Sequence, residues 1–160
     1  MSDSPFIYMK EHSKTVLWND SADPKEIKDA LTWGIVGATC NPVIALTALK
    51  ADKEYWVTRI KEFAKANPQA TDDQIGWAMV KELSSNAAKL FEPEFEKQNG
   101  RNGRLSIQTD PRNFRDAKLL ASQAVEFSKI AKNMIVKIPV TSEAIAAFEE
   151  ATYQGVSINA

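Results

Sequence analysis

Two patterns of hydrophobic and polar positions alternate along this chain. Short aliphatic runs are separated by longer stretches in which apolar residues recur every three or four positions. The short runs lie at residues 15–20, 35–39, 104–108, 134–139 and 156–159. Runs of this length are typical of buried strands, and the stretches between them are typical of amphipathic helices. The repeated order of strand, helix and strand predicts right-handed βαβ units and a parallel sheet.

The helices have start signals in the sequence. Asp23-Pro24, with Glu26 three residues after the aspartate, combines an N-cap with proline at the first helical position. Thr71 and Gln74 fit a capping box, and Pro68 divides the helical stretch before it from the one after it. We expect helices at about residues 23–34, 42–50, 52–95 (in two parts), 113–132 and 142–154. In the fourth of these, Phe114 is predicted to face inward.

Composition narrows the class of protein. The length of 160 residues predicts a single domain, and 20 Lys+Arg against 21 Asp+Glu leave no basic surface for nucleic acid. The polar segment 97–103 contains Arg101, but we interpret it as a solvated turn. No apolar run is long enough to span a membrane, and the N-terminus lacks a signal-peptide pattern. Cys40 and His12 are single residues of their types, so we expect a cytoplasmic protein without a metal or other cofactor.

Polar side chains gather on one face of the predicted strands. Because side chains alternate along a strand, Lys137 lies opposite Met134 and Val136. The polar positions assigned to the same kind of face are Ser106, Gln108, Lys137, Ser157 and Asn159. Asp20 leaves the carboxyl end of the first run. These side chains could therefore converge on one site.

Three architectures can produce this alternation. An antiparallel sheet with one solvated face is disfavoured because the connections are long enough to cross over between parallel strands. An open doubly wound sheet packs helices on both faces, where a lysine is hard to accommodate. A barrel of the (β/α)8 type keeps polar groups at the carboxyl mouth of its interior, and we favour it.

Lys137 is the sharpest chemical candidate. Its structural interpretation is a lysine that extends from an edge strand to solvent. Its functional interpretation is an amine in a partly desolvated cavity, where the neutral form can attack a carbonyl to give a Schiff base. Asp20 also has a structural interpretation, as the residue that ends its strand. Asn41, before Pro42, has a structural interpretation as a helix cap.

Five segments taken together resemble the transaldolases. They are LWNDSAD at 17–23, ATCNP at 38–42, GRLSIQTD at 103–110, IVKIPVT at 135–141 and GVSIN at 155–159. The segments occur in the family's order and span the chain from about residue 15 onward.

The resemblance implies an α/β fold, a parallel (β/α)8 TIM-type barrel. It implies transfer of a dihydroxyacetone unit from fructose 6-phosphate or sedoheptulose 7-phosphate to an aldose phosphate, in the pentose phosphate pathway. Lys137 would form the Schiff base, and Asp20 would take the proton released as the carbon–carbon bond breaks. Asn41 and Asn159 would hold the substrate hydroxyls, and Thr39 and Ser106 would also contact substrate. No metal is implied.

Gln108 departs from the family pattern, which usually has glutamate there. An amide can orient a water molecule but cannot exchange a proton with it, so general acid/base assistance of roughly 10²–10⁴-fold is at risk. The related fructose-6-phosphate aldolases carry glutamine near this position and favour cleavage over transfer. A cleavage enzyme is therefore the alternative enzymatic prediction.

The resemblance covers only about five of the eight βα units of such a barrel. We expect residues 1–160 to form one partial barrel domain with a helical insertion at about 52–95. The family's phosphate-binding arginines belong to later strands, so weak or absent activity is expected of the chain alone. An open barrel edge also predicts self-association, or a non-catalytic partial barrel that pairs with another chain.

Overall fold

Five parallel strands form a single sheet in the computed structural model, which describes residues 4–160. The strands are β1 (Trp18–Asn19), β2 (Gly37–Cys40), β3 (Arg104–Gln108), β4 (Met134–Lys137) and β5 (Ile158–Asn159). They lie side by side in chain order, β1-β2-β3-β4-β5. A doubly wound sheet reverses its strand order at a switch point, whereas a TIM-type barrel does not. The topology is therefore that of a partial barrel, as the sequence predicted.

The sheet is curled rather than flat. The Asn159 side-chain nitrogen on β5 donates to Ser106 Oγ on β3 at 3.1 Å, although β4 lies between these two strands. In a flat sheet, strands two apart are separated by roughly 9–10 Å. Direct contact between two short side chains across that interval requires a concave surface, which is the inner wall of a barrel.

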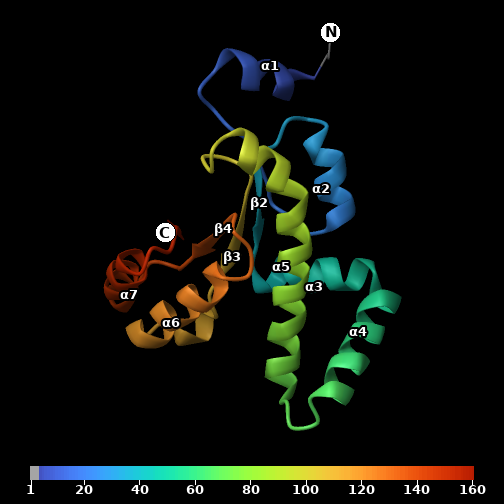
Figure 1. Cartoon of the computed structure of the whole chain (residues 1–160), viewed down its shortest axis with the longest axis vertical. Coiled ribbons are helices and arrows are strands. Elements are labelled where there is room, and N and C mark those ends of the chain that lie inside the picture. The colour runs from blue at the N-terminus through green and yellow to red at the C-terminus, as the bar shows by residue number, and fades with distance from the viewer. Residues whose placement is uncertain (1–3) are drawn as a thin grey trace.

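Helices fill the connections between the strands, and one further helix, α1 (Pro5–His12), precedes β1 (Figure 1). The others are α2 (Pro24–Leu31), α3 (Pro42–Ala51), α4 (Lys53–Ala66), α5 (Asp72–Lys97), the 3-10 turn η1 (Pro111–Asn113), α6 (Ala117–Ser128) and α7 (Ser142–Tyr153). The predicted caps are present: Asp23 accepts from two backbone N–H groups, and Thr71 and Gln74 form a complete capping box. The sequence patterns did not predict α1.

The helix predicted at residues 113–132 is shorter than expected, and this prediction was wrong at its start. Asp110 caps the turn η1, and α6 begins only after Asp116, whose side chain caps it. Two local caps therefore replace one continuous helix. Phe114 lies between them and is exposed, not directed inward.

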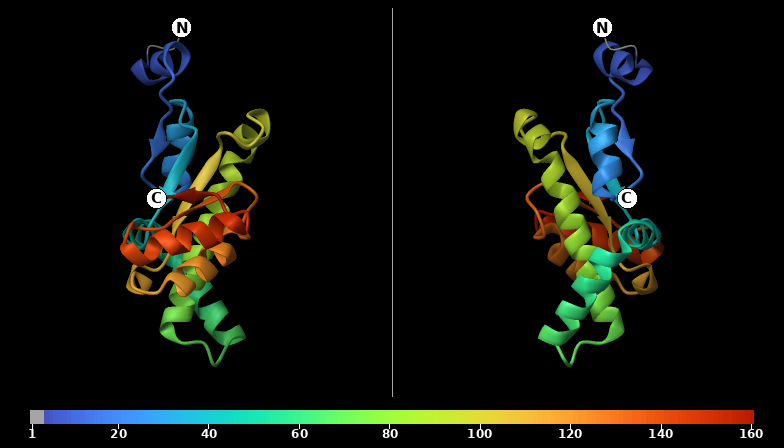
Figure 2. Two further views of the ribbon diagram at one scale, coloured as in Figure 1. Left: turned by 90° about the vertical axis from the view of Figure 1, so that its left-hand side faces the viewer. Right: turned by 90° about the vertical axis from the view of Figure 1, so that its right-hand side faces the viewer.

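The core lies on the outer, helix-covered face of the sheet. Leu105, Ile107 and Val136 are fully buried on this face. Helix α5 packs on β3, and α6 packs on β4 and α7. Met79 and Leu83 of α5 are both buried in this core. Helix α5 and α4 form a long hairpin that extends beyond the sheet (Figure 2).

One buried polar residue ties the core together. Asn133, fully buried just before β4, donates to the carbonyl of Ala88 in α5 and to the carbonyl of Gly103 before β3, both at 2.8 Å. These bonds join segments 45 and 30 residues away in the chain. Asn133 therefore fixes α5 against the amino ends of β3 and β4.

Candidate active site at the carboxyl ends of the strands

The inner face of the sheet carries side chains in layers. In the parallel register, Trp18, Gly37 and Arg104 are neighbours at the amino end. Thr39 is paired with Ser106 in the next layer. The third layer, at the carboxyl end, is a row formed by Gln108, Lys137 and Asn159. Most of these positions are polar, in contrast with the aliphatic outer face; the exceptions are Trp18, Gly37 and Ile135, which is paired with Ser106.

Lys137 lies in the middle of the carboxyl-end row. Its Cα is paired with Gln108 of β3 on one side and with Asn159 of β5 on the other. Lys137 and Asn159 are half-buried, whereas Gln108 is buried. Within residues 4–160 the Lys137 ammonium takes part in no ion pair. The predicted nucleophile is therefore a half-buried lysine whose strand neighbours on both sides are amide-bearing residues.

Asp20 and Thr39 form a second group on this face. The Thr39 hydroxyl donates to Asp20 Oδ1, which joins the end of β1 to β2. Asp20 is exposed and Thr39 is half-buried. Because Thr39 is paired in register with Ser106, this group adjoins the Ser106–Asn159 hydrogen bond. The structure thus links Asp20, Thr39, Ser106 and Asn159 across the concave face.

Asn41 has the structural role that its sequence context allowed. Its Oδ1 accepts from the backbone N–H groups of Val43 and Ile44, both at 2.9 Å, and so caps α3. The side-chain oxygen is therefore occupied by the helix. A substrate contact by Asn41, predicted from the resemblance, would have to use its side-chain NH2 group.

The chain just after Gln108 is firmly anchored. Thr109 N–H donates to the carbonyl of Lys137 at 3.0 Å, and Asp110 N–H donates to the Gln123 side chain at 2.6 Å. The Asp110 carboxylate accepts from the backbone and guanidinium of Arg112. The guanidinium of Arg112 holds the pKa of the Asp110 carboxyl below its usual range, against the opposing effect of burial. These contacts fix the position of Gln108 beside Lys137.

Sequence reasoning did not identify the floor of the inner face. At Gly37 a Cβ atom would lie 2.7 Å from both the Arg104 carbonyl and the Trp18 ring, so only glycine lets the indole lie there. Arg104 donates to the Gly100 carbonyl and lies over the Phe95 ring, 5.2 Å from its centroid. A glycine inside a strand pattern is the signal that could have revealed this close approach.

Residues 4–160, the described part of the chain, contain neither a cluster of metal-ligating side chains nor a helix of membrane-spanning character. No three His, Cys, Asp or Glu side chains come together in the way a metal ion requires. No helix in this range has the length and apolar character needed to cross a membrane.

Comparison with known proteins gives a consistent family. The family described as Transaldolase/Fructose-6-phosphate aldolase matches residues 17–160. A protein of Kocuria rhizophila named transaldolase is 32% identical over 130 residues, covering 80% of this chain and 34% of the relative. The transaldolase of Mycolicibacterium smegmatis is 33% identical over 130 residues, with the same coverage.

A third relative extends the match. The transaldolase of Saccharopolyspora erythraea is 29% identical over 151 residues, covering 89% of this chain and 40% of the relative. This chain thus spans between about a third and two fifths of the length of these relatives. The family match includes all five strands, and the partial barrel agrees with it. By sequence and by fold, the chain belongs to the transaldolase/fructose-6-phosphate aldolase family.

Proposed function

We propose that this chain carries the Schiff-base chemistry of a transaldolase, with fructose 6-phosphate or sedoheptulose 7-phosphate as donor of a dihydroxyacetone unit and an aldose phosphate as acceptor, as in the pentose phosphate pathway. The observation that carries the proposal is the row of Gln108, Lys137 and Asn159 on the concave face. The Thr39–Asp20 hydrogen bond adds a carboxylate to the same face.

The amine of Lys137 would begin the reaction. It attacks the C2 ketone of fructose 6-phosphate, and loss of water gives an iminium ion. The cationic iminium draws electrons from the C3–C4 bond, which breaks as Asp20 takes the proton of the C4 hydroxyl. Glyceraldehyde 3-phosphate leaves, and the remaining enamine carbon attacks the acceptor aldehyde. Water then hydrolyses the new iminium and releases the Lys137 amine.

The neighbours of Lys137 would position the substrate. The side chains of Ser106 and Asn159 already hydrogen-bond to each other, so they are oriented before substrate arrives. In this proposal they hold the hydroxyls of the dihydroxyacetone unit, and Thr39 keeps Asp20 directed at the reacting carbon. The NH2 group of Asn41 is a further donor for these hydroxyls.

Gln108 determines which of two reactions is favoured. It is buried next to Lys137, where an amide can hold a water molecule but cannot shuttle its proton. Slow hydrolysis of the iminium is expected in either reaction. Acceptor-independent cleavage of fructose 6-phosphate is the second candidate activity; in it the enamine carbon takes a proton instead of attacking an acceptor, and water then releases dihydroxyacetone and the Lys137 amine. Because the Lys137 side of the inner face is only half-buried, we expect slow turnover by the 160-residue chain.

The test is release of glyceraldehyde 3-phosphate from fructose 6-phosphate, with and without erythrose 4-phosphate. The proposal expects slow release that the acceptor stimulates, formation of sedoheptulose 7-phosphate, and loss of both in Lys137→Met. Release that is independent of the acceptor would instead favour the cleavage reaction, and Gln108→Glu should then shift the balance toward transfer. Release that persists unchanged in Lys137→Met would overturn both.

We also propose that the chain self-associates through the edges of the sheet. Among residues 4–160, strands β1 and β5 each have a partner strand on one side only. Val16 is 46% exposed and Trp18 37% exposed near the β1 edge, and exposed strand edges favour pairing between chains. Sedimentation at increasing concentration should show dimers or larger species; a monomer throughout would contradict self-association.

A further inference from the structure

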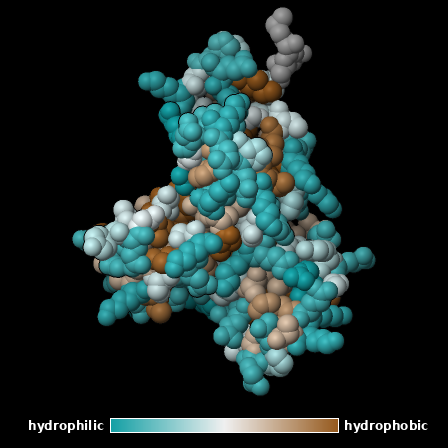
Figure 3. Space-filling view, in the orientation of Figure 1, coloured by the Kyte–Doolittle hydropathy of each residue, from teal (hydrophilic) through white to brown (hydrophobic). Residues whose placement is uncertain are grey.

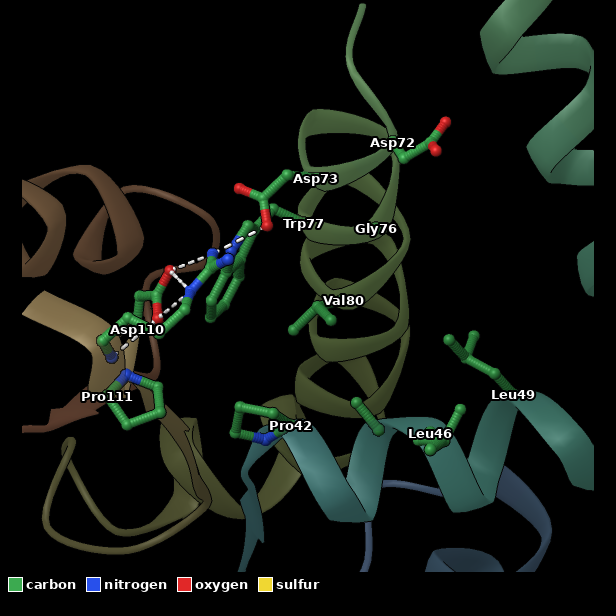
Figure 4. Close-up of a pocket in the computed structure, with 12 residues that line it drawn as sticks. Pro42, Leu46, Leu49, Asp72, Asp73, Gly76, Trp77, Val80, Asp110 and Pro111 are labelled. Carbon is green, nitrogen blue, oxygen red and sulfur yellow. Dashed lines mark hydrogen bonds and ion pairs between the residues drawn. The ribbon is translucent and has the colours of Figure 1, made fainter.

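A groove outside the inner face has no role in the proposed reaction. It lies between α3, the first turns of α5 and η1, and has a volume of about 460 Å³ (Figure 4). That volume is in the range of small-molecule sites. Its walls are mainly apolar and include Leu46, Leu49, Trp77 and Val80. Pro42 and Pro111 also line it, so the groove opens at the carboxyl end of the sheet, on the side of the helices.

Gly76 makes one wall of this groove. It lies inside α5, where glycine is destabilising relative to alanine. Its backbone does not have a positive φ, and a Cβ atom placed on it would meet no atom within 4 Å. Neither backbone conformation nor packing therefore requires glycine at this position. The effect of the glycine is that no side chain occupies this side of the groove.

The mouth of the groove is acidic. Arg112 donates to Asp73 at 2.7 Å and also to Asp110, and this guanidinium is the one basic group among the lining residues. Asp72 is a third carboxylate of the lining, and among the described residues it takes part in no ion pair. Three carboxylates against one guanidinium leave a net negative charge.

We propose that this groove binds a small organic cation with an apolar body, such as an aryl- or alkylammonium ion. The apolar body lies against Leu46, Leu49 and Val80, and the ammonium group lies at the rim near Asp72, whose carboxylate points away from the Arg112–Asp73 ion pair. An anion of the same skeleton is repelled by this rim. The site does not use Lys137, so it can bind its ligand whether or not the chain performs the proposed transfer.

The experiment compares three probes that share one skeleton: 4-phenylbutylammonium, 4-phenylbutan-1-ol and 4-phenylbutyrate. Each is titrated into the isotopically labelled 160-residue chain, and NMR follows the Gly76 amide and the Trp77 indole N–H signals. The cation is expected to shift both signals saturably and to bind at least about tenfold more tightly than the anion, a difference of about 1.4 kcal/mol. The affinity for the alcohol is expected to lie between the affinities for the cation and the anion.

Three variants locate the site. Gly76→Leu fills the groove and should weaken cation binding at least tenfold, whereas Gly76→Ala, its matched control, should keep most of it; circular dichroism checks that both are folded. Leu46→Lys, at an exposed helical position, places a positive charge in the groove and should also weaken binding of the ammonium probe. Asp72→Asn should lower the affinity for the ammonium probe and leave the affinity for the alcohol unchanged.

Several results would overturn the proposal. These are equal binding of the three probes, shifts that do not saturate, or full cation binding by both Gly76→Leu and Leu46→Lys. A dimer that dissociates in Gly76→Leu, with no binding of the ammonium probe, would show that a second copy of the chain occupies the groove instead.

Discussion

The two faces of the same five strands differ in almost every property. The outer face is aliphatic, covered by helices and closed to water, as at Ile107 and Val136. The inner face is polar and half-open, and its side chains bind one another, as Ser106 and Asn159 do. Adjacent residues of a strand therefore differ in what they contact: one packs in the core and stabilises the fold, and the next faces the concave side.

The surface seen in Figure 3 is mostly hydrophilic, with small apolar patches between helices.

The sharpest test of this division uses two adjacent residues of β3. Ile107→Ala removes a fully buried side chain from the outer face and should lower the free energy of unfolding by about 2–5 kcal/mol. Ser106→Ala removes one hydroxyl and its hydrogen bond to Asn159, and should cost only about 1 kcal/mol. Urea unfolding followed by circular dichroism measures both. Equal losses would mean that the two faces do not differ in their contribution to stability.

The reactivity of the Cys40 thiol measures how well the outer face excludes water. Burial raises the pKa of its thiol to about 11 from the usual 9.0, and the nearby Ser84 hydroxyl offsets part of this effect. Each pKa unit lowers the thiolate fraction about tenfold, so alkylation at pH 8 should be at least about a hundredfold slower in the folded chain than in urea. Iodoacetamide labelling measured by mass spectrometry gives the ratio. Similar rates would show that this face admits water.

Asn133 is one of the few polar residues that are fully buried, together with Ser84 and Thr109. Replacing it with alanine leaves the carbonyls of Ala88 and Gly103 without their donor, and should lower the free energy of unfolding by about 2 kcal/mol. Asn133→Asp keeps the shape but removes the NH2 donor, so its loss should be at least as large. Thermal or urea unfolding measures both variants. If both variants were as stable as the parent chain, the role given to Asn133 in fixing α5 against β3 and β4 would be wrong.

Asp110 gives the smallest expected effect and a dependence on pH. Its folded pKa is lowered, chiefly by the hydrogen bond from Arg112, so its contribution to stability is present above the unfolded value near 3.9 and is lost as pH falls through the folded pKa. Asp110→Asn should cost about 1 kcal/mol or less at pH 7, because Arg112 is exposed. Unfolding measured from pH 7 to 3 should show the difference shrinking below pH 4. A difference that grew in acid would contradict this assignment.

Local patterns predicted the part of the molecule that depends on local geometry. The alternation of side chains placed Lys137, Ser106 and Asn159 on one face because a strand repeats every two residues. Caps such as Asp23 and Thr71 were predictable because each binds backbone groups only two or three residues away.

The rest depends on contacts between distant segments. Asn133 binds carbonyls 30 and 45 residues away, and nothing in its neighbourhood of the sequence signals this. The Asp20–Thr39 bond likewise joins different strands. Phe114 was predicted to face inward because helical periodicity continues through it, but the cap at Asp116 starts the helix after it. Periodicity alone could not reveal that competing cap.

The proposed chemistry requires that the reactive amine of this chain lies on the inner face, at Lys137. The chain is incubated with fructose 6-phosphate, reduced with borohydride, and mapped by peptide mass spectrometry, with Lys132 as an exposed reference lysine that is ion-paired to Glu96. We predict a reduced dihydroxyacetone or hexose phosphate adduct on Lys137, in much greater amount than on Lys132, and the loss of this adduct in Lys137→Met. Adduct spread evenly over exposed lysines, or none on Lys137 under conditions that label the Kocuria rhizophila relative, would contradict it.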